Sequence, residues 1–462
     1  MADQLTDLHL ADLHERAERA GISGYRKLRR EQLIEALEGG DDEGRGAAAA
    51  SEPRPESSPK RGRRGGRGRS RGGRRPAADT DEPDTDELPV TGTVLDDSGP
   101  VEVGAGADGE KTEDAPTEEA RGVLDLTRQR FGFLRLGGLT PADGDVYVSA
   151  AQVRRCELRP GDEVAGPARE PRRGERHRAL VHVDTVNGAE LEAEASRPEF
   201  DDLAPDLPGP RVLLDVPDAG IDVRAVDLLA PLALGQRVLI RAAPRSGRTT
   251  LLRSLARAAV VDEQVRVVVL LIDERREEVP AWREALPTAE FAIATSDLAP
   301  VEQLRIAELA TERARRLAES GANVVLVCDS LSRVAVAAGG VDEVKRLFGT
   351  GRNLAGGGSV TVLATTLADG SDEGAADRAV ITTESSLITL DPELAAAGHF
   401  PALKPAECRV SNEDALRTEA ELEAARRLRS LLADLDPVEA SRWLRERVEG
   451  SKTNAELLAD LT

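Results

Sequence analysis

Aromatic residues are scarce in this chain, which has six Phe, two Tyr and two Trp among its 462 residues. Each of them can therefore be considered individually. Lysine is rare too: the sequence contains only six, so nearly all of its 62 basic residues are arginines. Such a bias is typical of a GC-rich genome, and it becomes important at one position of the chain.

Cysteines and long apolar runs are also limited. Cys156, Cys328 and Cys408 are far apart and have no paired spacing, which argues against a disulfide framework or a zinc site. No apolar run reaches the roughly 18 residues of a membrane span, and the polar N-terminus lacks the apolar segment of a signal peptide. We therefore expect a soluble, cytoplasmic protein with no membrane partner.

The net charge of −22 at first argues against a nucleic-acid partner. The charge is distributed unevenly, however. Residues 61–75 hold eight Arg and six Gly, whereas residues 79–119 hold fifteen acidic residues and one Lys. Because local patches govern electrostatic binding, the net charge does not exclude RNA.

Changes in composition along the chain predict two or three domains. Residues 1–40 have apolar residues at helical spacing and are expected to form a small helical module, with a solvated helix face as an equal alternative. Residues 41–119 are polar and are predicted to be a disordered linker. The arginine–glycine tract at 61–69 is typical of segments that contact nucleic acid, although it could simply pair with the acidic run beside it.

Two folded regions follow the linker. Residues 120–190 contain short alternating segments, which predict an OB-type β-barrel with strands at 123–126, 131–135, 145–148, 162–165 and 179–183. A connector at 191–225 leads to residues 226–462, where apolar runs alternate with helical stretches. Such runs indicate a parallel α/β sheet, with strands at 238–240, 267–272, 324–327, 360–363 and 387–390 and a charged helical cap over the last 45 residues.

The barrel contains a candidate surface for unpaired bases. Phe131, Phe133 and Arg135 alternate along one strand, so they share one face, and Tyr147 lies on the next strand. Aromatic rings and an arginine exposed together form a stacking platform for single-stranded RNA. The alternative is that the rings fill the barrel core. Further contacts to the RNA backbone are expected from Arg154, Arg155, Arg172, Arg173 and Arg176.

A candidate phosphate-binding loop follows the first strand of the α/β region. Residues 242–249 read AAPRSGRT and precede a helix with Leu251, Leu252 and Leu255. Backbone amides of such a loop and the helix N-terminus can hold phosphate, and Thr249 can ligate Mg²⁺. The loop departs from the G-x-x-x-x-G-K-[ST] pattern, because Ala242 replaces its first Gly and Arg248 its Lys. A strand-to-helix turn without a ligand is the alternative.

Two acidic residues lie at the ends of later strands. Glu274 follows 267–272, and Asp329 follows 324–327. The carboxyl ends of parallel strands are where ligands bind in such sheets. One carboxylate there can hold the Mg²⁺ shell while the other orients an attacking water. Either alone is a common strand ending, but together with the loop they predict an ATPase site.

These motifs resemble those of the transcription termination factor Rho family. The first module is similar to the family's N-terminal domain, and the segments 122–135, 145–149 and 174–176 are similar to its cold-shock-like RNA site. In the α/β region the motifs at 235–237, 242–249, 270–279, 329–333 and 348–353 occur in the family's order. The resemblance implies a multidomain α/β protein in which a helical domain, an OB barrel and a RecA-like P-loop domain assemble as a homohexameric ring.

The resemblance also implies functional residues. Catalytic roles fall to Glu274, which would activate water, to Arg409 as an arginine finger, and to Arg248; Mg²⁺ would be held by Thr249 and Asp329. ATP would be bound by Gly235, Gln236, Arg237, Arg245, Ser246, Gly247, Arg248, Thr249, Thr250 and Arg275. RNA would be bound by Arg130, Phe131, Gly132, Phe133, Leu134, Arg135, Asp145, Val146, Tyr147, Glu175, Arg176 and His177. The implied partners are single-stranded RNA and the RNA polymerase elongation complex.

Several positions depart from the family pattern. Arg245 and Arg248 replace the loop lysines, and a planar guanidinium does not occupy the compact position of an ammonium. In the family, two loops that grip RNA in the pore of the ring carry a lysine. The segment 334–342, at the place of the first loop, is shorter than the family's and has no lysine. The segment 369–373, at the place of the second, is acidic. His177 stands where an aromatic residue is usual. Two hypotheses therefore stay open: an RNA-dependent ATPase and helicase that terminates transcription, or a catalytically impaired regulator that binds RNA and nucleotide.

Overall fold

The computed structural model describes residues 116–461, except 191–196, 208, 217–218, 262–263 and 369–373. The predicted helical module, residues 41–115 of the predicted linker with the arginine–glycine tract, and the acidic loop at 369–373 lie outside the described residues. The last residues assigned to the disordered linker, 117–119, belong instead to the first strand of the barrel. No helix of the described ranges is long and apolar enough to cross a membrane.

The first folded region is a closed β-barrel, as the sequence predicts. Its strands β1 and β2 pair with each other, β1 also pairs with β4, and β3 pairs in parallel with β5, which gives the closed order β1-β2-β3-β5-β4. The bounds are β1 Thr117–Leu126, β2 Gly132–Arg135, β3 Val146–Val148, β4 Glu163–Arg169 and β5 Ala179–Leu180, with β6 Thr185–Val186 and β7 Ala189–Glu190 beyond. The last predicted strand is therefore shorter than expected, since β5 ends three residues before Val183.

A short helix, α3 (Ala150–Arg155), connects β3 to β4 and was not predicted. It begins with a capping box in which Ser149 and Gln152 satisfy each other's backbone amides. The interior of the barrel is aliphatic and contains no aromatic side chain. Its buried side chains include Leu124, Leu134, Val146, Val148 and Val164.

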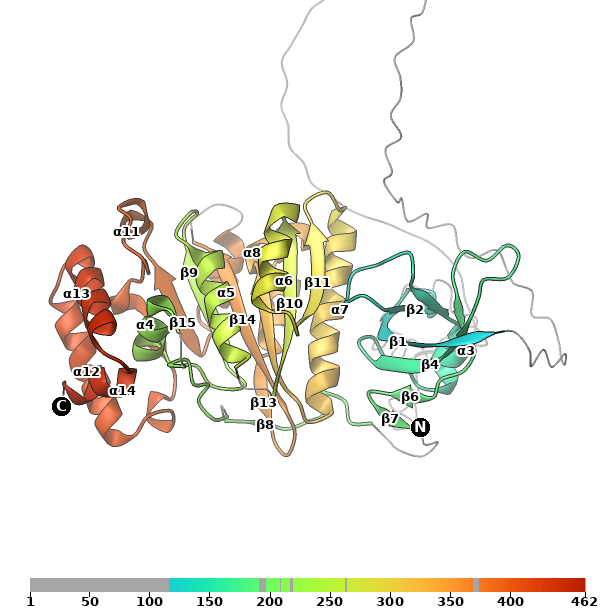
Figure 1. Cartoon of the computed structure of the whole chain (residues 1–462), viewed down its shortest axis with the longest axis horizontal. Coiled ribbons are helices and arrows are strands. Elements are labelled where there is room, and N and C mark those ends of the chain that lie inside the picture. Colours follow the sequence, from blue (N-terminus) through green and yellow to red (C-terminus); the bar gives the residue numbers. More distant parts are fainter. Residues whose placement is uncertain are drawn as a thin grey trace, which may run out of the picture. The chain divides into compact units, whose positions relative to one another are not determined.

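The second region is an α/β domain with a mainly parallel sheet in the order β11-β10-β12-β14-β9-β15-β16 (Figure 1). The strands are β9 Arg237–Ala242, β10 Val265–Glu274, β11 Glu290–Thr295, β12 Asn323–Asp329, β14 Ser359–Leu367, β15 Ser386–Leu390 and the antiparallel β16 Arg409–Val410. All five predicted strands are confirmed. The edge strand β11 was missed, because its alternating residues do not form the continuous apolar run of a central strand.

Alternate residues of the central strands enter two separate cores. Val267, Val269 and Leu271 of β10 face one core, whereas Val268 and Leu270 face the other. The first core is covered by α4 Ile221–Leu229, α5 Arg248–Ala259, α6 Val279–Ala285, α12 Glu419–Ala433, α13 Pro437–Gly450 and α14 Asn454–Ala459. The second is covered by α7 Pro300–Glu319, α8 Leu331–Ala338, α9 Asp342–Gly349 and α10 Ala375–Val380. Burial on both faces explains why these strands are apolar throughout.

The C-terminal helices form the expected cap on the sheet. Leu428 of α12 and Leu444 of α13 are buried in the first core. Asn454, which is 3% exposed, donates from its side chain to the carbonyl of Arg224 and to Asp227 on α4. The remaining elements of the described residues are short: β8 Pro205–Asp206, β13 Arg352–Leu354, α11 Pro392–Ala396 and three single turns of 3₁₀ helix.

The barrel packs against the edge of the α/β domain at β11 and α7. The amide of Leu139 donates to the carbonyl of Phe291 (2.8 Å), and Thr140 exchanges hydrogen bonds with Ile293. These contacts occupy backbone groups that an edge strand would otherwise leave unpaired. Arg313 of α7 is almost fully buried and pairs with Glu163 of the barrel and with Glu290 of β11.

Gly161 is the point of closest approach between the barrel and α7. Its φ is +83°, and a Cβ there would lie 2.6 Å from the backbone nitrogen of Arg313. Gly174 also has a positive φ, +96°, but a Cβ there would meet nothing within 4 Å. Alanine substitutions at the two glycines share the cost of a positive φ, but only the one at Gly161 adds a steric clash. Comparing them therefore separates the two costs.

We expect Gly161→Ala to lower the free energy of unfolding more than Gly174→Ala does. Both changes carry the cost of a left-handed alanine, about 1 kcal/mol, and Gly161→Ala adds an overpacking cost of roughly 1–3 kcal/mol. Urea denaturation of both variants measures the difference. Equal destabilisation would show that the barrel does not need this close contact.

Candidate functional site

The phosphate loop occupies the turn between β9 and α5. Gly247 has φ +86° and directly precedes the first helical residue, Arg248. Inside the loop the hydroxyl of Ser246 donates to the carbonyl of Ala243 (2.9 Å), which tightens the turn. The free amides of the first turn of α5 therefore point out of the loop, where they favour an anion.

Asp329 connects this loop to the central strands. It ends β12, is fully buried, and its two carboxylate oxygens accept hydrogen bonds from Thr249 (2.7 Å) and Thr365 (2.9 Å). The predicted Mg²⁺ residues Thr249 and Asp329 are thus in contact, whereas Thr365 was not predicted. The described residues contain no group of three or more His, Cys, Asp or Glu side chains that could hold a metal ion. A pair of oxygen ligands suits Mg²⁺, which is usually completed by phosphates and water.

Glu274 lies at the end of β10, next to β12 in the sheet. It is only 5% exposed, and its carboxylate accepts hydrogen bonds from the amide of Arg275 (2.9 Å) and the guanidinium of Arg333 (3.0 Å). Arg333, at the start of α8, belongs to the motif at 329–333 but was not predicted as a site residue. Its position follows from the strand order, which places α8 beside the end of β10.

Arg248 provides a test of whether the loop fits a phosphate. One terminal nitrogen of its guanidinium is buried and has no hydrogen-bond partner among the described residues. A buried, unpartnered cationic donor is costly, and an anion in the loop would satisfy it. The residues present therefore fit a bound phosphate, although a lysine would present a more compact charge.

Three predicted nucleotide residues lie elsewhere. Gly235, Gln236 and Arg237 precede or begin β9, so about 15–20 Å of strand separates them from the loop at its other end. Gly235 approaches Asn353, Gln236 accepts from the amide of Ala233, and Arg237 donates to the carbonyl of Thr383. In this chain they hold turns together at that end of the strand, and their assignment to the nucleotide site stays a prediction.

The other predicted catalytic and nucleotide residues are at the surface. Arg245, Thr250 and Arg275 are exposed around the loop and the end of β10. Arg409 lies on β16 at the far edge of the sheet, where it pairs with Glu384 (2.6 Å). It is therefore remote from Glu274 of its own chain, as an arginine acting on a neighbouring subunit would be.

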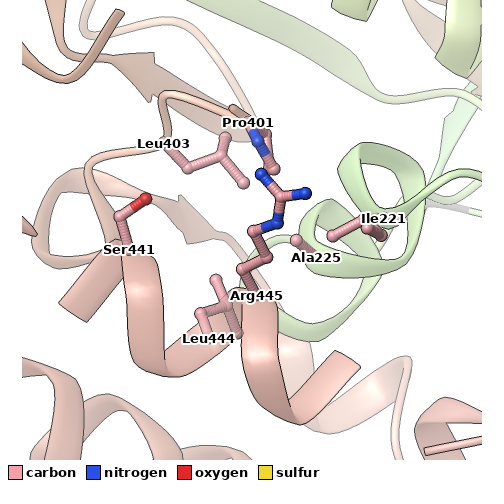
Figure 2. A pocket seen from close by; sticks show the side chains of 7 residues that line it. All are labelled: Ile221, Ala225, Pro401, Leu403, Ser441, Leu444 and Arg445. Carbon is pink, nitrogen blue, oxygen red and sulfur yellow. The ribbon is translucent and has the colours of Figure 1, made fainter. Parts of the chain in front are cut away.

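Phe400 is an aromatic residue that sequence reasoning did not assign to the site. Its ring is half-exposed, and a Cβ on Gly247 would lie 3.6 Å from it, so it flanks the phosphate loop. Figure 2 shows the pocket behind this segment, where Pro401 and Leu403 face α4 and α13. The guanidinium of Arg445 is directed toward Pro401 and donates to the carbonyl of Phe400 (3.5 Å). This support holds the exposed ring in place.

The predicted platform forms a cluster of four rings on the outside of the barrel. Phe131 lies 5.9 Å from Phe133 and 5.6 Å from Tyr147, and His177 lies 5.1 Å from Phe133. All four are partly exposed and none belongs to the barrel core, so the alternative that they fill it is wrong. Partial burial raises the pKa of Tyr147, which keeps its hydroxyl protonated.

Arg135 differs from its predicted exposed position. It is only 6% exposed and is paired with Asp125 and Asp145, while its guanidinium lies 5.5 Å from the centre of the Phe133 ring. Asp125 also pairs with Arg305 of α7 (3.1 Å). Arg135 thus supports the platform from below. Gly132, Leu134, Asp145 and Val146 are likewise buried, so their predicted contacts to RNA could come only through the backbone.

Glu175 lies in the loop beside the rings, between the exposed Arg176 and the half-buried Arg169. Arg169 donates to both of its carboxylate oxygens (2.6 and 2.8 Å), and the amide of Arg172 donates to one of them (2.9 Å). The hydrogen bonds from Arg169 are the main cause that lowers the pKa of Glu175 to about 2. The carboxylate is therefore ionised at neutral pH and anchors the loop.

Together these features define a P-loop nucleotide-binding protein of RecA-like architecture that carries an OB-type barrel. Three family models match successive parts of the chain. They are the Rho termination factor N-terminal domain at residues 4–38, the Rho termination factor RNA-binding domain at 120–192, and the ATP synthase alpha/beta family nucleotide-binding domain at 222–350.

Curated relatives agree with these models. The transcription termination factors Rho of Aquifex aeolicus and Bacillus subtilis are 35% and 34% identical to this chain, over 73% and 72% of it and 83% of each relative. The chain belongs to the transcription termination factor Rho family. It is also 36% identical to Rho of Streptomyces lividans, but spans only 51% of that protein's length. Among solved structures, a type III secretion system ATPase aligns with 61% of the chain and 90% of its own, at 23% identity and a TM-score of 0.46.

A titration of Glu175 tests the loop beside the platform. Because the pKa is lowered from 4.5 to about 2, the contribution of this carboxylate to stability is fully present above pH 4.5 and is lost as the pH falls through about 2. We expect an NMR titration of its side-chain carboxyl to have a midpoint near 2, and Arg169→Gln to raise that midpoint. A wild-type midpoint near 4.5 would contradict the anchoring role.

Proposed function

We propose that this chain is a Rho-type termination factor that binds single-stranded RNA on the barrel, hydrolyses ATP to translocate along it and releases transcripts from RNA polymerase. The observation that carries the proposal is the aromatic cluster of Phe131, Phe133, Tyr147 and His177 outside the barrel core. Exposed rings without a structural role in the core are suited to stacking unpaired bases, each worth about 1–3 kcal/mol.

The nucleotide site supports the second half of the proposal. Bound ATP·Mg²⁺ would supply the phosphoanhydride bond that is cleaved. Thr249 and Asp329 would hold the cation, and Arg248 and the loop amides would bind phosphate oxygens. Glu274, fixed by Arg333, would orient a water and accept its proton. Phe400 would stack on the base.

Assembly into a homohexameric ring is part of the same proposal. Arg409 lies at the sheet edge opposite the strand that carries Glu274. In a closed ring, where different surfaces of neighbouring subunits meet, such an arginine can reach the next subunit's phosphates and stabilise charge there. Exposure of Arg409, apart from its pair with Glu384, is compatible with that role.

Two aromatic substitutions separate the sites. We expect Phe133→Ala to weaken binding of a cytosine-rich RNA about 5- to 100-fold, the loss of one stacked base, while ATP binding is unchanged. Phe400→Ala should weaken ATP binding and leave RNA binding unchanged. Fluorescence anisotropy with labelled RNA and with labelled nucleotide measures both. Loss of RNA binding in both variants would point to misfolding, and unchanged RNA binding in Phe133→Ala would contradict the platform.

ATP turnover with and without cytosine-rich RNA tests the enzyme. We expect RNA to stimulate turnover, and Arg248→Lys to raise the stimulated rate about tenfold, because an ammonium fits closer to the phosphates. Arg257→Lys, at the other end of α5, is the matched control and should change nothing. If neither the wild type nor Arg248→Lys hydrolyses ATP, the result supports the catalytically impaired regulator. The family relationship by itself favours the enzyme.

A further inference from the structure

A second charged surface adjoins the aromatic platform. It is a pocket of about 440 Å³, a size typical of ligand sites. The pocket is formed by the turn before β2, by α3 with the residues that follow it, and by the connector after residue 196. Its charged lining consists of four arginines and two glutamates, namely Arg130, Arg154, Arg159, Arg197, Glu157 and Glu199.

Two residues of the pocket lining have a positive φ. Six non-glycine residues in the described part of the chain have positive φ, and two of them are asparagines, which tolerate that conformation. Arg245 and Asp273 belong to the surroundings of the nucleotide site. The other two, Arg130 (φ +65°) and Glu157 (φ +47°), both line the pocket. Glu157 takes this conformation at the end of α3, where the amide of Leu158 donates to the carbonyl of Val153 (3.0 Å), and Arg130 takes it in the turn between β1 and β2. Local turns therefore hold both side chains at the pocket.

The four arginines fall into two groups. Arg159 is fixed by the buried Glu319 (2.8 Å) and Arg197 by the buried Asp162 (2.8 Å), so their positions are set by the fold. Arg130 and Arg154 are exposed and make no ion pair with any described residue. The pocket thus offers two uncompensated cations beside two pre-positioned ones.

The position of Arg130 identifies the occupant. This residue directly precedes Phe131 of the platform, so a strand whose base stacks on Phe131 brings its phosphates to the mouth of the pocket. Glu157 and Glu199 would repel a free phosphate ion, but a ribose offers them 2′-hydroxyl donors. A ribonucleotide backbone therefore matches both the cations and the carboxylates of the lining.

We propose that this pocket is a backbone subsite that holds phosphodiester groups of the RNA strand bound on the platform. The subsite rests on the proposed RNA-binding function and extends it. The platform takes the bases, while Arg130 and Arg154 take the phosphates that follow, which lengthens the bound segment beyond the stacked nucleotides.

Two variants of the full chain test the subsite. Arg154→Gln removes one free cation, and Arg130→Gly removes the other while it relieves the positive φ, so that its melting temperature should be unchanged or higher. The probes are a cytidine dinucleotide, which covers the platform alone, and an oligocytidylate of about ten nucleotides, within the site size of an OB fold. Binding is measured over a range of salt concentrations.

We expect each variant to bind the longer RNA about 3- to 10-fold more weakly, with the slope of log K against log salt reduced by about 0.7, the loss of one phosphate contact on a single strand. Dinucleotide binding should stay within about twofold of the wild type, because the platform is intact. The matched control is Arg121→Gln, which removes the same charge from an exposed position on β1, outside the pocket.

The outcomes distinguish the subsite from the platform. If Arg121→Gln weakens binding as much as Arg154→Gln, the effect is general electrostatic attraction and the subsite is wrong. Wild-type affinity of both pocket variants for the longer RNA would also overturn it, while leaving RNA binding by the platform in place. Failure of the wild type to bind either probe would overturn the proposed RNA-binding function together with the subsite.

Discussion

The buried carboxylate of Asp329 is the interaction on which the nucleotide site depends. It accepts hydrogen bonds from Thr249 on the first turn of α5 and from Thr365 on β14. Hydrogen bonds to a buried charge contribute roughly 1.5–3 kcal/mol each, and leaving the charge unpaired would cost more. This carboxylate therefore fixes α5, the helix that follows the phosphate loop, against the central strands β12 and β14. The position of Arg248 in the loop follows from that anchor.

A second set of buried charges attaches the barrel to the α/β domain. Arg305 of α7 pairs with Asp125, which also pairs with Arg135 beneath the Phe133 ring. Buried ion pairs add little net stability, but loss of one partner is strongly destabilising, about 3–5 kcal/mol. These ion pairs act mainly to fix one arrangement of the barrel against the α/β domain. The result is a continuous chain of contacts from the aromatic platform to a helix that packs on the central sheet.

The two sites differ in how they treat arginine. At the phosphate loop Arg248 stands where a lysine is usual, and its guanidinium keeps an unpartnered nitrogen. Around the barrel, some arginines are placed by acidic partners, as Arg159 and Arg197 are, and others make no ion pair with a described residue. A chain of net charge −22 can therefore present local cationic surfaces, because the acids that compensate some arginines fix them in place and leave others exposed.

The sequence by itself determined the element types and the motifs. Alternation identified the barrel strands, and continuous apolar runs identified the five central strands, because burial on one or both faces is written directly into residue order. It also placed Glu274 and Asp329 at the carboxyl ends of two strands, and these strands are neighbours in the parallel sheet. The ring cluster could be predicted from the spacing of Phe131 and Phe133, which alternation places on one face.

Only the tertiary structure decided which polar residues are buried and which are free. Arg135 reads from its strand position as exposed, yet Asp125 and Asp145 of other segments pair with it. Arg305 of α7 in turn pairs with Asp125. Gly235, Gln236 and Arg237 belong to a family motif, and the fold places them at the end of β9 away from the phosphate loop. Phe400 reaches the phosphate loop from more than 150 residues away. Long-range packing sets these positions, and local periodicity contains no information about it.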